Sequence, residues 1–159
     1  MKWFTVDVYS GVDQDGNELP DETFSQARRA YNEHLASIEL RLSPEVRALA
    51  KVVMHDAVPR EVRANYPKSL AIKFELRGQV SGPVRRPLDL TYWRWDLGSG
   101  IGVPSLDTLM EWGGEQFQVL NDEIDIASDG RYIHRLKFWP AGELVVLFAE
   151  LSIGPTTEE

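Results

Sequence analysis

The chain has no cysteine and only three histidines among its 159 residues. The lack of cysteine excludes a disulfide scaffold, a thiol nucleophile and a cysteine-ligated metal site. No apolar run approaches the roughly 18 residues that a membrane-spanning helix needs. The opening residues also lack the apolar core of a signal peptide. We therefore expect a cytoplasmic protein that has no membrane partner.

Basic residues are scarce as well, with 17 Lys and Arg against 25 Asp and Glu and a net charge of −8. This balance gives no electrostatic case for binding nucleic acid, and it favours a basic protein as partner. A chain of about 150 residues buries about 70% of the surface that it exposes when unfolded, which is enough to fold without disulfides or a structural metal. We expect one domain over residues 1–153 and a frayed tail over 154–159, and we leave the oligomeric state open.

The apolar pattern predicts two helices near the start of the chain. Asp21 is the expected N-cap of the first helix. Steps of three and four place its apolar residues on one face: Phe24, Ala27, Tyr31, Leu35, Ile38 and Leu42. The run Ser43-Pro44-Glu45 predicts the start of a second helix that ends near Lys51, because proline is favoured in the first turn.

Beyond the helices, apolar and polar residues alternate as they do in strands. We expect an extended segment over residues 52–58 that Pro59 limits, and strands over 70–76, 88–95, 115–126, 132–139 and 143–153. Helices first and strands afterwards predict an α+β fold. In this fold an N-terminal helix pair packs on an antiparallel β-sheet with a C-terminal meander. Residues 1–10 fit either a strand or a short helix, and both alternatives stay open.

Two segments carry a resemblance to a known family: residues 1–5 (MKWFT) and 53–57 (VMHDA). They resemble an uncharacterised family of small bacterial proteins that open Met-Lys-Tyr-Phe-Thr and carry a His-Asp-Ala motif before their strands. The chain departs from that pattern at Trp3 and in the loop over residues 11–20. Domains of this kind are similar to toxin-immunity proteins. The resemblance implies a bacterial, cytoplasmic, inhibitory protein and implies no catalysis.

His55 and Asp56 are the first candidates for chemistry, because adjacent imidazole and carboxylate groups suit a hydrolytic divalent metal ion. With His134 they would form the site of a metal-dependent hydrolase. The alternative is structural: one of the pair fixes the entry to the sheet through backbone hydrogen bonds. A further alternative is that His134 forms an acid–base pair or a cross-strand polar pair with Asp122 or Glu123.

The segment Tyr92, Trp93, Arg94 and Trp95 is the densest aromatic group in the chain. These residue types are enriched at binding hot spots. On a strand Trp93 and Trp95 share one face and Tyr92 occupies the other, so at least one face must be covered by chain, ligand or partner. The group is therefore either part of the core or part of an interaction surface, and Trp112 is expected nearby.

The acidic run Asp122, Glu123 and Asp125 is either a solvated strand edge or a surface for a basic partner. It lacks the spacing of an EF-hand calcium site. The loop over residues 98–104 is rich in glycine but has no Lys-Ser/Thr ending, so we interpret it as a flexible connection rather than a phosphate-binding loop. Ser105 is the expected cap of a short helical turn after it.

The leading hypothesis from the sequence is a non-enzymatic protein-binding domain without a cofactor. An immunity or inhibitor protein that neutralises a basic toxin is the most concrete form of this hypothesis. Its expected partner-binding residues are Tyr92, Trp93, Arg94, Trp95, Asp122, Glu123 and Asp125. The alternatives are the metal-dependent hydrolase and a small-ligand binder with a pocket lined by tryptophans.

Overall fold

The computed structural model describes residues 1–5, 8, 10–12, 15–77, 85–98, 117–139 and 142–154. In this part of the chain the order of elements is α2 (Thr23–Ile38), a 3-10 turn (Glu39–Arg41), α3 (Pro44–Leu49), β1 (Val58–Asn65), β2 (Ser69–Arg77), β3 (Arg85–Trp93), β4 (Asp96–Leu97), β5 (Gln118–Ile126), β6 (Tyr132–Trp139), β7 (Glu143–Phe148) and β8 (Glu150–Ile153). A mixed α+β fold is confirmed, and most of its regular structure is β. None of the described helices is both long enough and apolar enough to cross a membrane.

The helical region consists of one long helix and one short helix. The long helix, α2, begins at Thr23, two residues after the expected cap Asp21, and no side chain caps its first turn. The second helix begins as predicted, because the Ser43 Oγ accepts a hydrogen bond from the Val46 backbone N–H at 3.3 Å. It has only six residues, although Val46 and Leu49 on it are buried in the core. The predicted pair of helices is therefore wrong: the described residues form one long helix and one short one.

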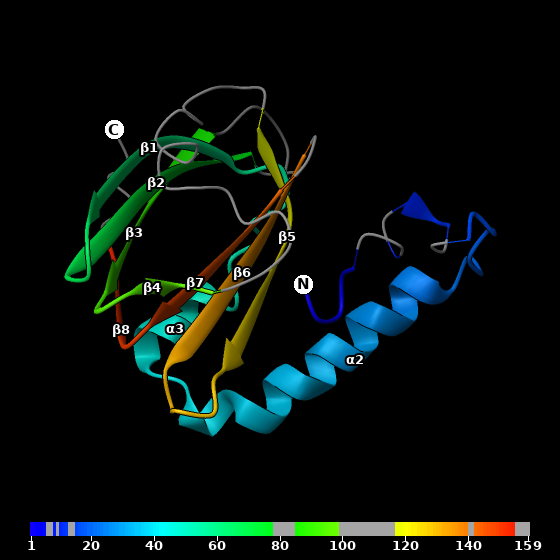
Figure 1. Cartoon of the computed structure of the whole chain (residues 1–159), viewed down its shortest axis with the longest axis horizontal. Helices are drawn as coiled ribbons and strands as arrows, with labels where there is room; N and C mark the ends of the chain where they lie inside the picture. The colour runs from blue at the N-terminus through cyan, green and yellow to red at the C-terminus, as the bar shows by residue number, and fades with distance from the viewer. Residues whose placement is uncertain are drawn as a thin grey trace.

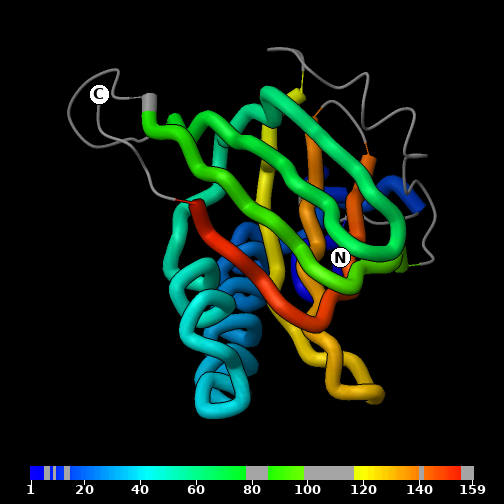
Figure 2. Tube along the Cα trace, turned by 90° about the vertical axis from the view of Figure 1, so that its left-hand side faces the viewer, coloured from blue at the N-terminus to red at the C-terminus, as the bar shows by residue number. Residues whose placement is uncertain are grey.

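The strands form two four-stranded antiparallel sheets in the described residues, where the sequence predicted one. The first sheet has the order β1-β2-β3-β8 and the second has the order β4-β7-β6-β5. In Figure 2 the strands of the first sheet cross in front of those of the second. Their facing side chains make the hydrophobic core, as the contact of Tyr92 on β3 with Phe148 on β7 illustrates. The strands β5, β6 and β7 follow one another as an antiparallel meander.

The strand expected over residues 143–153 is divided at Ala149 between the two sheets. Phe148 pairs with Tyr132 in the second sheet, and Glu150 pairs with Trp93 in the first. The side chains of Phe148 and Leu151 both reach the core, from different sheets. A continuous apolar run signals burial on both faces but does not reveal a bend, which is why the sequence pattern predicted one strand.

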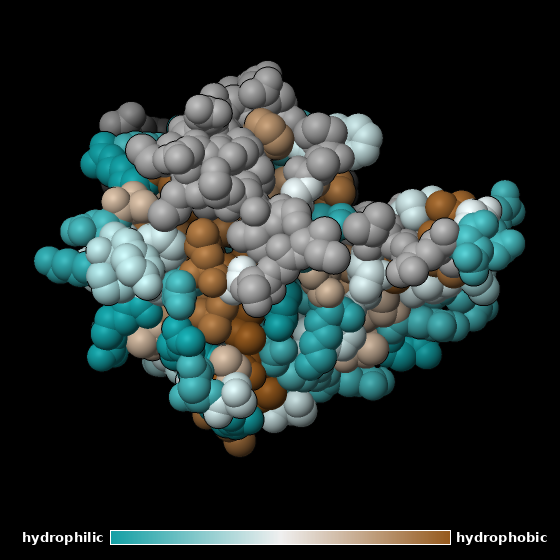
Figure 3. All heavy atoms as spheres, in the orientation of Figure 1, coloured by the Kyte–Doolittle hydropathy of each residue, from teal (hydrophilic) through white to brown (hydrophobic). Residues whose placement is uncertain are grey.

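The face of the second sheet that is turned away from the core carries an apolar stripe. It shows in Figure 3 between hydrophilic residues. Along β7, which lies between β4 and β6, the outward side chains of Val145 and Leu147 are half-buried. Gly98 packs against this strand so closely that a Cβ there would lie 2.5 Å from the Val145 Cγ1. The apolar residues on both faces of β7 fit its place between two other strands of the sheet.

The segment before β1 is a turn, where the sequence predicted an extended run ending at Pro59. The extended structure instead begins at Val58 and contains Pro59. Proline is tolerated there because β1 is an edge strand and its register shifts between Pro59 and Glu61. The turn joins the sheets, since the Val119 N–H donates to the Ala57 carbonyl at 2.8 Å.

The free edge of the second sheet is protected by α2, which runs beside β5 in Figure 1. The buried Tyr31 hydroxyl on this helix accepts the Ile124 backbone N–H of β5 at 2.6 Å. An uncovered edge strand invites pairing with other chains, and a helix that takes its donors removes that hazard. Burial, and then the charge of Asp122, raise the pKa of Tyr31 well above its usual value, so the hydroxyl stays protonated.

The Tyr31→Phe variant tests this contact. We expect the free energy of unfolding to fall by about 1–3 kcal/mol, because the buried Ile124 N–H loses its acceptor. Urea denaturation measures the change. The Tyr66→Phe variant is the matched control, since Tyr66 is 63% exposed, and it should leave the midpoint unchanged. Equal midpoints for both variants and the wild type would show that Tyr31 does not secure the edge.

Candidate functional site

His55 and Asp56 lie in the turn before β1. Since the Leu120 carbonyl can only accept, His55 donates its Nδ1–H to that oxygen at 2.7 Å. Its Nε2 lies 3.5 Å from the Asp56 carboxylate, and both side chains are substantially exposed. Asp56 has a φ of 64°, in the left-handed region, which aspartate tolerates better than most residues. The His55 side chain and the Asp56 backbone N–H, which donates to the Val119 carbonyl at 2.8 Å, therefore hold the turn before β1 to β5.

His134 lies apart from that turn, in a buried chain of polar groups between the two sheets. Its Nε2 is 3.3 Å from the Asp122 Oδ2, and its Nδ1 is 2.7 Å from the Tyr92 hydroxyl. Because a carboxylate only accepts, the Nε2 carries a proton. Burial, and then the charge of Asp122, raise the pKa of Tyr92 well above its usual value, so Tyr92 keeps its proton. The sequence anticipated the pairing of His134 with Asp122.

The metal site expected from His55, Asp56 and His134 does not form in the described part of the chain. His134 is fully buried and pairs with Asp122, whereas His55 and Asp56 face the surface. No group of three or more His, Asp or Glu among the described residues is placed to hold a metal ion. Within the described residues, no set of His, Asp and Glu ligands therefore supports the hydrolase alternative.

The aromatic group over residues 92–95 does not make one surface. Tyr92 and Trp95 are buried, while Trp93 is half-buried and donates its Nε1–H to the Ser152 hydroxyl at 2.9 Å. Arg94 is exposed and has a φ of 51°. The strand ends at Trp93, so this left-handed residue turns Trp95 into the core instead of onto the face that it was expected to share. The expected Trp112 and the Ser105 turn lie outside the described residues, as does the glycine-rich loop beyond residue 98.

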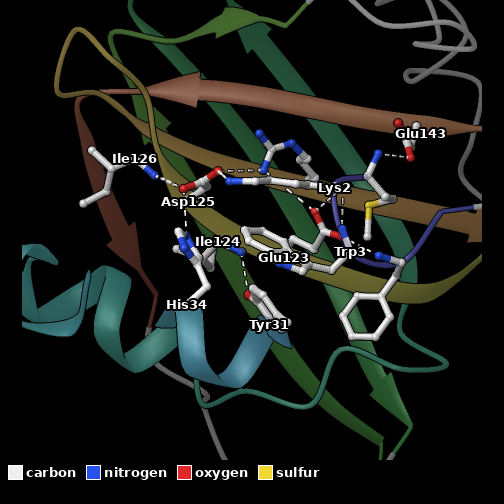
Figure 4. A network of polar contacts seen from close by, with 12 residues as sticks. Lys2, Trp3, Tyr31, His34, Glu123, Ile124, Asp125, Ile126 and Glu143 are labelled. Atoms are coloured by element: carbon white, nitrogen blue, oxygen red, sulfur yellow. Dashed lines mark hydrogen bonds and ion pairs between the residues drawn. The ribbon is translucent and has the colours of Figure 1, made fainter. Parts of the chain in front are cut away.

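The acidic run of β5 is held by the protein itself. The fully buried Glu123 carboxylate accepts the backbone N–H groups of Lys2, Trp3 and Phe4, each at 2.8 Å to its nearer oxygen. Figure 4 shows this carboxylate pointing at the opening segment. The N-terminal amino group forms an ion pair with Glu143. Glu123 is therefore an anchor for residues 2–4 rather than a surface for a partner.

Asp125 is similarly engaged beside the anchor. It lies 2.9 Å from the His34 Nε2 and 3.4 Å from an Arg135 nitrogen, and the Lys2 amino group is 3.5 Å away (Figure 4). Burial raises its pKa, but the Ile126 N–H and these cationic neighbours outweigh burial and hold the pKa below 3.8. Asp122, which pairs with His134, completes the set. All three carboxylates that were expected to face a basic partner have partners inside the chain.

A cavity of about 740 Å³ lies between α2, the turn over residues 50–55 and β5. We call it the α2 groove. Phe24, Arg28 and Leu35 line it from the helix, the Asn121–Asp122 pair from β5, and residues 50 and 52–55 from the turn. Tyr31, Asn32, Phe4 and Arg77 complete the lining. His55 and Asp122 are the candidates from the sequence that meet in this groove.

One feature of the sequence corresponds to this groove, namely the apolar stripe of the first helix. This stripe was expected to pack on one face of the sheet. Its later members, Ile38 and Leu42, are buried, but Phe24 remains 38% exposed and Leu35 is half-buried. The earlier part of the stripe therefore lines the groove. Spacing identifies the apolar face of a helix but does not say how completely it is covered.

Comparison of the chain with protein-family models, with curated proteins and with solved structures finds no match. The arrangement of the α2 groove is thus the basis for a functional proposal.

The Glu123→Gln variant tests the anchor. An amide offers fewer acceptor sites and sets its own N–H groups against the backbone donors. We expect the free energy of unfolding to fall by about 2–3 kcal/mol and the amides of residues 2–4 to exchange faster with deuterium. The exposed Glu33→Gln variant on α2 is the control and should behave as wild type. Unchanged exchange of those amides would contradict the anchoring role.

The Asp125→Asn variant tests the lowered pKa. A carboxyl with a folded-state pKa below its unfolded value of 3.8 stabilises the protein at higher pH. That stabilisation is lost as the pH falls below the unfolded value and through the folded one. Wild type should therefore exceed the variant in stability near pH 7, and the difference should shrink toward pH 3. Urea denaturation at stepped pH measures it, and a difference independent of pH would contradict the assignment.

Proposed function

We propose that this protein is a non-enzymatic binding domain and that the α2 groove is its binding site. The observation that carries the proposal is the cavity of about 740 Å³ beside α2. Ligand sites are concave, mostly apolar and usually about 300–1,000 Å³ in volume. The groove has this size and combines aromatic and aliphatic side chains with a few polar groups.

The rim of the groove supports the proposal. Val53 is 78% exposed on the turn, across from Phe24 on the helix. Exposed apolar side chains are individually ordinary, but those around a concave site offer contact area to an occupant. Arg28 and Asn32 are exposed along the same helix face, where they are available to orient a bound molecule.

The partner predicted from the sequence was a basic protein, bound through the aromatic group and the acidic run. Because these residues are engaged within the chain, the α2 groove replaces them in the proposal as the contact site. An immunity or inhibitor role remains a proposal on this basis. In it, the partner would insert one side chain into the groove.

The edge of β5 limits what enters. The Tyr31 hydroxyl accepts the Ile124 N–H and the His55 ring donates to the Leu120 carbonyl, so backbone groups on both sides of the groove-lining Asn121–Asp122 pair already have partners. An added strand therefore cannot pair along this edge in the manner of β-augmentation. A compact ligand or a single inserted side chain fits better than an extended peptide.

The Asn32→Trp variant tests the site by filling the groove with a large side chain from its exposed helical wall. The matched control is Glu33→Trp, one residue along the same helix and outside the groove lining. A fragment library is titrated into labelled protein and followed by backbone amide shifts. We expect some fragments to bind and to shift the amide signals of residues 52–55 and 121–122. Asn32→Trp should weaken the affinity of these fragments at least about tenfold, equivalent to 1.4 kcal/mol. Glu33→Trp should leave their affinity unchanged.

Two outcomes would contradict the proposed site. Fragment shifts that cluster elsewhere would place binding on another surface. Groove-directed binders of unchanged affinity in Asn32→Trp would show that this wall does not contact them.

A further inference from the structure

β1 is an open edge of the first sheet. The strand order β1-β2-β3-β8 leaves one long side of β1 without a neighbour among the described strands, and Figure 2 shows it at the border of that sheet opposite β8. Its second half is exposed at Arg63, Ala64 and Asn65. An edge strand presents a row of backbone N–H and C=O groups with which another strand can pair. None of the residues that line the α2 groove lies on β1, so this edge is a separate surface.

The other sheet edges in the described part of the chain are less available. The edge at β5 is covered by α2, where the Tyr31 hydroxyl accepts the Ile124 N–H. The edge strand β8 is in contact with α3, and the edge strand β4 has only two residues. Among the described strands, β1 with its eight residues is therefore the long edge that an added strand can reach.

Geometry restricts how two copies of β1 can pair. In an antiparallel pair, residues that direct their N–H and C=O groups across the gap lie opposite each other, and such residues alternate along each strand. Two identical strands therefore pair about a residue that faces its own copy, and not about a point between two residues. Pairing about Val62 runs over residues 60–64. It stays clear of Pro59, which has no N–H, and of the turn that follows Asn65.

The register about Val62 sets opposite charges against each other. On both sides of the central pair, Glu61 of one copy would face Arg63 of the other. Within one copy these two side chains form an ion pair, and the Lys73 amino group lies 3.3 Å from the Glu61 carboxylate. Pairing about Glu61 or about Arg63 would instead set each of these residues against its own copy. Opposite charges across strands are stabilising and like charges are destabilising, so the charges select the register about Val62.

The side chain of Val62 supports the same register. Val62 is half-buried and packs against the hydrophobic core, whereas Glu61 and Arg63 point to the opposite face of the strand. With Val62 opposite its own copy, an apolar cross-strand pair forms at the centre of the interface. Charged residues on an edge strand commonly prevent pairing. In this register they are matched, so they specify the partner instead of repelling it.

We propose that this protein forms a symmetric dimer in which β1 pairs antiparallel with the β1 of a second copy about Val62. The first sheets of the two copies then become one continuous sheet. The occupant is a second copy because the order of charges along β1 is complementary to itself in this register. The interface covers only residues 60–64 of each copy, so it belongs to the small, weak or transient class.

Sedimentation velocity of the full chain, from about 10 μM to about 1 mM, measures the dissociation constant of a weak dimer. Arg63→Glu and Glu61→Arg each set like charges against each other and should raise this constant at least about tenfold. An equimolar mixture of the two variants should dimerise again, because the acidic strand of one faces the basic strand of the other. Arg29→Glu and Glu33→Arg, at exposed positions of α2, change the net charge equally and should leave the constant unchanged.

Cross-linking tests the register independently. The chain has no cysteine, so one introduced thiol per copy is unambiguous. In the proposed pairing the two copies of residue 62 face each other with Cβ atoms about 5 Å apart. The two copies of residue 64 lie about 13 Å apart, at about 3.4 Å per residue along the strand. A short thiol cross-linker should therefore join Val62→Cys into a covalent dimer and leave Ala64→Cys monomeric, although Ala64 is exposed.

Three results would overturn the proposal. The first is a wild-type chain that sediments as a monomer at every concentration. The second is a dimer that both charge reversals leave intact, or that cross-links preferentially at Ala64, because its interface or register would then be a different one. The third is loss of the dimer in both variants without recovery in their mixture, since the reversals would then act within each copy. The fragment screen on the α2 groove is independent of all three.

Discussion

The buried carboxylate of Glu123 is the interaction on which the N-terminal side of the structure depends. Three successive backbone N–H groups converge on it, so the opening segment crosses β5 in one fixed position. That position places Phe4 against Phe24 and Tyr31 of α2. A buried charge is costly unless it is fully hydrogen-bonded, and this network meets that condition. The helix, the opening segment and the groove wall are thus coupled through one side chain.

The alternation of β5 explains why three neighbouring carboxylates have three different environments. Asp122 points between the sheets to His134, while Glu123 and Asp125 point to the opposite face, toward the opening segment and α2. Successive side chains on a strand face opposite ways. The same acidic run therefore supports the core on one side and the helix on the other. Its charges are used within the fold, which is why they do not form a surface for a basic partner.

The α2 groove exists because the helix covers the edge of β5 only in part. Tyr31 holds the middle of α2 to the strand, and Ile38 and Leu42 bury the following turns. The earlier turns, which carry Phe24 and Arg28, face the turn that joins α3 to β1 across the groove. Side chains from separate segments of the chain thereby surround one cavity. The proposed binding site is a consequence of this partial coverage.

Local patterns in the sequence were enough to predict the helical face of α2, the start of α3 at Ser43-Pro44-Glu45, the alternating strand around Phe74 and the strand Tyr132–Trp139. These features depend on neighbours within a few residues, and local sequence records such neighbours directly. The pairing of His134 with Asp122 was also within reach, because a two-residue offset across a hairpin puts side chains on the same face.

Only the tertiary structure decided how these pieces combine. The bend at Ala149 that sends one apolar run into two sheets depends on contacts with strands far away in the chain. The turn of Trp95 into the core and the burial of Glu123 beneath residues 2–4 likewise rest on long-range packing. The type and spacing of a residue limit what its side chain can bind. Which partner it contacts depends on the distant segments that pack against it. For this reason the sequence determined an acidic α+β domain, and its folding determined where a groove is left open beside α2.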